Sequence, residues 1–129
     1  MKKYLLRAPA IILTILIFLV SSFSLDKLPD TRILSYDKII HVIEYAVYTF
    51  SVALALSTSS KDTIYRNLFL ISVSIGLMYG ALDEFHQFFV NGRKSSIFDW
   101  FADAGGSFLG IYLYNKLKNI RWLSYDPID

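Results

Sequence analysis

The chain has 129 residues, of which 54% are hydrophobic and none is cysteine, and its formal net charge at pH 7 is +2. Its mean hydropathy of +0.43 is higher than a soluble domain of this length usually carries, so we predict one membrane-embedded domain over residues 1–129. The lack of cysteine excludes a thiol nucleophile, a thiolate metal ligand and a disulfide framework, and the lack of a basic stripe with interleaved aromatics excludes nucleic acid as a partner.

Four apolar segments follow one another along the chain, at about residues 8–23, 37–57, 67–90 and 97–114. Because about 20 apolar residues in a helix cross a bilayer, we predict an all-α fold, an integral membrane bundle of four transmembrane helices. The first segment also has the basic start of a signal peptide, but it lacks a good A-x-A cleavage site and three more apolar segments follow it. Between the segments we expect an exposed loop at 24–36, a polar turn at 57–62 and a tight turn at Asn91-Gly92.

The distribution of Lys and Arg predicts how the bundle is oriented. With four spans and the N-terminus inside, eight of the thirteen basic residues lie on the inner side and five on the outer side. Cytoplasmic segments carry the excess of Lys and Arg in membrane proteins. We therefore expect a multi-pass protein of the cell membrane with both termini in the cytoplasm.

Polar and small residues form one stripe on each of three predicted helices. They recur at helical spacing (i, i+4, i+7, i+11), which places them on a single face. The starts of the second and fourth helices and the end of the third share the outer side, so these faces meet at one depth. The sequence predicts a polar pocket open to the outer face, bounded by Asp37, His41, Glu44 and Tyr48, by Gly76, Gly80, Asp83 and Gln87, and by Asp99, Asp103, Gly106 and Gly110.

Each of these side chains also has a structural interpretation. Asp37 can cap a helix, Ser96 with Asp99 resembles a capping box, and His41 can be a packing residue. Asp83 and Asp103 lie deeper on the packed stripes. A functional role is favoured for them, because ionisable groups inside a membrane are costly. The acidic residues in this region outnumber the basic ones. Some carboxylates must therefore be protonated, bound to a cation or paired with a basic residue.

Two contacts are predicted from that surplus. Arg93 should reach back to Asp83, Glu84 or Asp99, and His41 should contact Asp83 directly or through one water. A divalent metal held by the carboxylates and His41 is an alternative counter-ion, but no H-x-x-x-H or H-E-x-x-H spacing supports one, so no metal ligand is assigned from the sequence. No cofactor and no oligomeric state follow from the sequence.

Three motifs in this order resemble the VanZ-like family. They are DKIIHVIEY at 37–45, DEFHQFFVNGR at 83–93 and DWFADAGGSFLG at 99–110. The resemblance implies a small multi-helix membrane protein, in a family named after a member associated with resistance to the glycopeptide teicoplanin. Its motif positions correspond here to Asp37, Lys38, His41, Tyr45, Asp83, Glu84, Gln87, Arg93, Asp99 and Gly106. Asp103 departs from the family pattern, which usually has asparagine, so a carboxylate replaces an amide donor.

We expect the pocket to engage a membrane lipid or a lipid-linked cell-wall precursor through its headgroup, with a link to teicoplanin resistance. Arg93 would pair with phosphate and Lys38 would assist it. The other expected ligand-binding residues are Tyr45, Glu84, Gln87, Asp99 and Asp103. One alternative is an intramembrane enzyme with His41 as general acid or base, oriented by Asp37 or Asp83. The other is a structural bundle in which the polar residues only fix helix register.

Overall fold

The computed structural model describes residues 2–24, 36–120 and 123, and within these ranges every regular element is a helix. In chain order the helices are α1 (Lys2–Ser21), α2 (Asp37–Ser57), α3 (Asp62–Arg66), α4 (Leu68–Gln87) and α5 (Ile97–Leu117). The all-α prediction is confirmed. Most of the loop expected at 24–36 lies outside the described residues.

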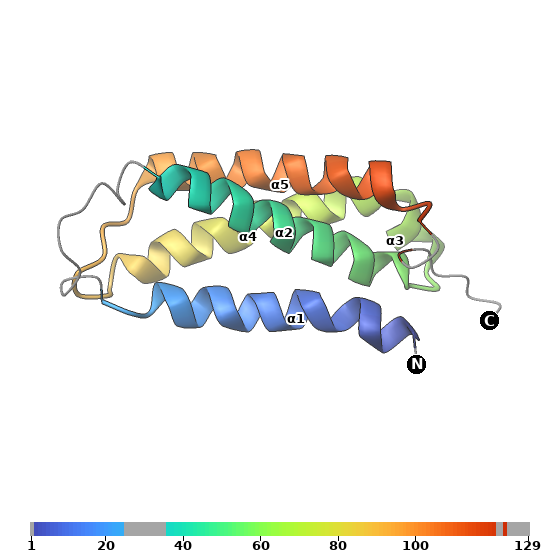
Figure 1. Cartoon of the computed structure of the whole chain (residues 1–129), viewed down its shortest axis with the longest axis horizontal. Coiled ribbons are helices and arrows are strands. Elements are labelled where there is room, and N and C mark those ends of the chain that lie inside the picture. Colours follow the sequence, from blue (N-terminus) through green and yellow to red (C-terminus); the bar gives the residue numbers. More distant parts are fainter. Residues whose placement is uncertain (1, 25–35, 121–122, 124–129) are drawn as a thin grey trace.

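The long helices run up and down the bundle (Figure 1). α2 and α5 lie side by side and parallel to each other, and α4 and α1 run in the opposite direction. As a result, the starts of α2 and α5 and the ends of α1 and α4 gather at one end of the bundle. We call this the polar end, and the start of α1 and the end of α5 lie at the opposite end.

The helix bounds differ from the predicted segments where the apolar pattern ends. α1 begins at Lys2, not near residue 8, because its basic side chains can extend away from the apolar stem while the backbone stays helical. α4 ends at Gln87, and the following residues turn into Asn91 and Gly92, whose φ of +80° is one that glycine adopts readily. α5 continues to Leu117, one turn beyond the prediction.

A short helix stands at the end of the predicted polar turn. α3 is held by an ion pair between Asp62 and Arg66, whose Oδ2 and Nε atoms are 2.9 Å apart at i, i+4. Both side chains are largely exposed. This helix was absent from the sequence prediction, because its five residues carry no apolar period.

Among the described residues, three helices are long and apolar enough to cross a membrane: α1, α2 and α4. The faces of α1 that point away from the bundle carry large apolar side chains, including Ile11, Ile15 and Phe18, each more than half exposed. Such a surface suits lipid and not water. Membrane-helix character is therefore present, whereas a fourth span at α5 stays a prediction.

The closest helix contact is between α2 and α5. A Cβ atom added at Gly106 would lie 3.0 Å from the Cβ of Tyr45 and closer still to the carbonyl oxygen of Val42. One turn further, a Cβ atom at Gly110 would lie 3.0 Å from the backbone nitrogen of Phe50. Glycine allows two helix backbones to approach in this way, as predicted from the small-residue stripes.

Candidate functional site

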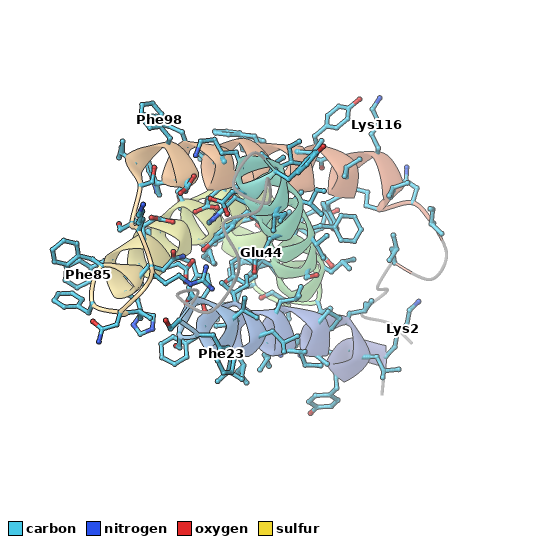
Figure 2. All side chains as sticks on the ribbon, turned by 60° about the vertical axis from the view of Figure 1, so that its left-hand side comes forward. Lys2, Phe23, Glu44, Phe85, Phe98 and Lys116 are labelled. Carbon is cyan, nitrogen blue, oxygen red and sulfur yellow. The ribbon has the colours of Figure 1, made fainter. Side chains whose placement is uncertain are left out.

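Ionisable side chains from α2, α4 and α5 meet inside the polar end of the bundle. His41, Asp83, Glu84, Asp99 and Asp103 are each at most 8% exposed. Burying a charged group costs several kcal/mol unless a partner offsets it. The partners of these side chains therefore decide what the site can do. Figure 2 shows oxygen and nitrogen atoms gathered among these helices near the end that carries Phe85 and Phe98.

His41 and Asp103 form the central pair. The Nδ1 atom of His41 lies 2.7 Å from Oδ1 of Asp103, in a buried hydrogen bond between α2 and α5. The other ring nitrogen, Nε2, lies 3.9 Å from Oδ1 of Asp37, one turn earlier on α2. The imidazole thus has a carboxylate on each side, one fully buried and one partly exposed.

His41 forms its hydrogen bond with Asp103, so the predicted direct contact with Asp83 is not formed among the described residues, and a contact through one water stays a prediction. Asp83 Oδ2 accepts a hydrogen bond of 2.9 Å from Nε2 of Gln87, one turn further along α4. Both of these side chains are buried. Asp83 is satisfied within its own helix, so Asp103 takes the place beside the histidine.

Lys38 neutralises the outermost acid of the cluster. Its Nζ atom donates to Oδ1 of Asp99 at 2.5 Å, and the Lys38 side chain is 55% exposed while that of Asp99 is 7% exposed. Asp99 does not act as the second half of a capping box. Ser96 alone caps α5, with its Oγ accepting from the backbone N–H of Phe98 at 3.2 Å.

Arg93 does not join the acids, which corrects the second predicted contact. Its Nη2 donates to the carbonyl oxygen of Val20 at 2.6 Å and its Nε to that of Phe23 at 3.0 Å. The last carbonyls of a helix have no partner within the helix and carry partial negative charge. Arg93 therefore caps the end of α1, and it has no acidic partner within ion-pair distance among the described residues.

Glu84 connects the cluster to an open groove between the end of α4 and the start of α5. Its Oε2 accepts from the backbone N–H of Ser96 at 2.7 Å. The groove has a volume of about 410 Å³ and is lined by Ala81, Glu84, Ser95, Ser96, Ile97 and Trp100. Of the predicted ligand-binding residues, only Glu84 lines it.

Trp100 has a role that the sequence reading missed. Its Nε1–H donates to the carbonyl oxygen of Leu77 at 3.1 Å, and the residue lines the groove. The sequence signal that could have placed Trp100 beside the groove is its spacing from Ser96, the N-cap of α5, because positions i and i+4 share a helix face.

Several buried polar atoms at and below the cluster have no hydrogen-bond partner within the part of the chain that the structure describes. In the cluster these are Oε1 of Glu84 and Oδ2 of Asp103. Tyr45, expected to bind a ligand, is fully buried with its hydroxyl unpaired. Deeper in the bundle the same holds for the hydroxyls of Thr49, Ser72 and Ser107.

The fold and the cluster define a membrane protein built as a helix bundle around buried ionisable groups. A family model described as VanZ/LLP1 matches residues 6–119, which is most of the chain, and the chain belongs to this family. No curated protein and no solved structure matches it.

Proposed function

We propose that this protein binds the headgroup of a membrane lipid or of a lipid-linked cell-envelope precursor at the polar end of the bundle. The observation that carries the proposal is Glu84, which is buried, lines the groove and keeps one oxygen without a hydrogen-bond partner among the described residues. A bundle held only by packing gains nothing from a buried carboxylate oxygen without a partner. A ligand that enters the groove and donates to this oxygen would offset that cost.

The charges around the groove favour a headgroup that donates hydrogen bonds. Arg93 is engaged by α1 and Lys38 by Asp99, so neither of the expected basic residues is available for a phosphate. Buried carboxylates instead suit an amine or hydroxyl group, such as that of an ethanolamine or sugar headgroup. The apolar part of the groove, formed by Ala81, Ile97 and Trp100, suits the chain of a lipid.

Large apolar side chains are exposed on the segments that form the groove. Phe85, Phe88, Phe98 and Phe101 are each more than half exposed. Phe85 and Phe98 point away from the bundle (Figure 2). Aromatic residues of this kind concentrate where a membrane meets water, which would allow a lipid to approach laterally.

The proposal includes α5 as a fourth span and the polar end as the outer face. Two observations support the span. α5 has 21 residues, about 31 Å of helix, and packs along α2. Its acids Asp99 and Asp103 are 5% and 0% exposed, so the charges that lower its hydropathy face protein and not lipid. The excess of basic residues on the opposite side supports cytoplasmic termini.

Native mass spectrometry of the purified chain tests the binding function. We expect a co-purifying lipid, with a preference for phosphatidylethanolamine over phosphatidylglycerol on exchange in nanodiscs. Glu84→Gln should reduce retention at least tenfold while the melting temperature stays near that of the parent. Asp62→Asn, at the exposed ion pair of α3, is the control. Equal retention by Glu84→Gln, or no selectivity between the two lipids, would refute the proposal.

The pair of His41 and Asp103 supports a second candidate, an intramembrane acid–base enzyme. A carboxylate that holds one ring nitrogen of a histidine fixes the other for proton transfer. Asp103 would be the orienting acid, in place of the predicted Asp37 or Asp83. Turnover of a labelled lipid-linked precursor by the parent but not by His41→Gln, with lipid retention unchanged, would favour this candidate over binding alone.

A link to teicoplanin resistance would follow if the bound headgroup belongs to a cell-wall precursor. Expression of the parent chain in a susceptible host should then raise the inhibitory concentration of teicoplanin, and Glu84→Gln should not. An unchanged inhibitory concentration, together with retained lipid, would separate headgroup binding from resistance.

A further inference from the structure

We propose that His41, Glu84 and Asp103 bind a first-row divalent cation such as Zn²⁺ or Mn²⁺. The three residues come from α2, α4 and α5, and each offers one ligand atom within 4.8 Å of the other two. This inference does not depend on headgroup binding, and a cation and a headgroup donor would compete for the same oxygen of Glu84. No sequence spacing could reveal the site, because its ligands stand on three different helices.

The burial of the ligands distinguishes this set from an ordinary acidic surface. His41 is 8% exposed, Glu84 6% and Asp103 0%. Two carboxylates brought together in a largely dry interior repel each other, and one imidazole cannot neutralise both. A cation bound between them would remove the repulsion.

The unpaired oxygens point to the same conclusion independently. Glu84 and Asp103 each use one carboxylate oxygen in a hydrogen bond, at 2.7 Å to the backbone N–H of Ser96 and at 2.7 Å to Nδ1 of His41. Their second oxygens, Oε1 and Oδ2, are buried and have no partner among the described residues. Each carboxylate is thus oriented by one oxygen while the other has no partner. The bond from Ser96 is an outer hydrogen bond of the kind that orients metal ligands, whereas the bond between Asp103 and His41 joins two of the proposed ligands.

A second group of possible ligands is less suitable. Asp37, His41 and Asp99 also offer atoms within 4.8 Å of one another. However, Asp99 is already paired with Lys38, and the Asp37 side chain is 37% exposed. Within the part of the chain that the structure describes, no lysine or arginine pairs with Glu84 or Asp103, so the site is assigned to these two residues and His41.

The donor atoms identify the class of ion. One imidazole nitrogen with two carboxylate oxygens suits Zn²⁺, Mn²⁺ or Fe²⁺, whereas Mg²⁺ and Ca²⁺ prefer oxygen alone. Metal–ligand bonds of about 2.1 Å place neighbouring ligand atoms about 3.0–3.5 Å apart. Binding would therefore draw the three side chains inward by about 1 Å, and three protein ligands would leave a position open to water or to a ligand.

The test uses the full chain in detergent, with its purification tag removed and bound metal stripped by a chelator. We expect about one Zn²⁺ per chain by elemental analysis after dialysis, and a matching titration with Mn²⁺ followed by electron paramagnetic resonance. Glu84→Gln should weaken Zn²⁺ binding at least tenfold, and Asp62→Asn should not. No stoichiometric binding by the parent chain, or equal affinity in Glu84→Gln, overturns the proposal.

A spectroscopic readout makes the result independent of any core variant that fails to fold. The chain has two histidines, His41 and His86, and His86 faces Ser22, with 2.9 Å between Nε2 and Oγ. The pulsed electron paramagnetic resonance spectrum of bound Mn²⁺ should show coupling to a ¹⁴N nucleus, and this coupling should persist in the variant His86→Gln. Absence of nitrogen coupling, or its loss in His86→Gln, overturns the assignment to His41.

Discussion

Replacing Gly106 by alanine tests whether the close contact of α2 and α5 holds the bundle together. The new Cβ atom would lie 3.0 Å from Cβ of Tyr45, where ordinary contact begins at 3.4 Å, and closer still to the carbonyl oxygen of Val42. Neither neighbour is the far end of a flexible side chain, so the two helices must separate by at least about 0.4 Å. Overpacking of this kind typically costs about 1–3 kcal/mol.

Gly105 provides a matched control one residue earlier on the same helix. A Cβ atom there meets nothing within 4 Å. Alanine stabilises a helix interior by about 0.5–1 kcal/mol relative to glycine, and both variants share this gain. The difference in unfolding free energy between Gly105→Ala and Gly106→Ala therefore isolates the steric cost, and we expect Gly106→Ala to be about 1–3 kcal/mol less stable.

Reversible unfolding in mixed micelles, followed by far-UV circular dichroism, measures this difference. The two variants must be compared at the same detergent composition, because helix association in a membrane depends on packing and not on hydrophobic burial. Equal stability of Gly105→Ala and Gly106→Ala would refute the view that this contact fixes the fold.

Three further predictions concern charges and topology. Lys38→Met should lower the unfolding free energy because it leaves buried Asp99 unpaired, and in calorimetry the double variant with Asp99→Asn should recover part of that loss. Arg93→Ala should release the end of α1, so that hydrogen exchange of its last turn speeds up about tenfold, corresponding to about 1.4 kcal/mol; unchanged exchange would show that the cap is not needed. In the cysteine-free chain, a cysteine placed at Asn91 should be labelled from outside and one at Ser60 from inside, and the reverse pattern would invert the proposed topology.

The sequence predicted α2 best, with both bounds correct, because a charged residue begins the helix and a run of polar residues follows it. α1 and α5 were predicted too short, since the hydropathy pattern marks the apolar core of a helix and not the turns that continue among basic residues. The residues of the site were also largely predictable. Equal depth on three helices placed His41, Asp83 and Asp103 in one layer before any contact was known, whereas Glu84 was expected to bind a ligand but was not placed in that layer.

The pairing within that layer was not predictable. Gln87 stands one turn beyond Asp83 and hydrogen-bonds to it, which leaves His41 to Asp103. The position of Arg93 depends on the end of α1, far away in sequence, whose carbonyl groups compete successfully with the acids. Both outcomes depend on how the helices are rotated against one another, and helical spacing alone does not determine that rotation.

The polar contacts and the glycine contacts of α2 and α5 form one continuous series. Starting from the polar end, Lys38 meets Asp99 and His41 meets Asp103. Gly106 then approaches Val42, and Gly110 approaches Ala46. On α5 each step advances about one turn, and on α2 the partners follow in the same direction along the chain, as the parallel arrangement requires. A shift of either helix by one residue would separate the ion pairs and force side chains into the backbone at the same time. The glycines therefore fix the register that brings the carboxylates to the lysine and the histidine, so a variant such as Gly106→Ala should disturb the buried cluster as well as the packing below it.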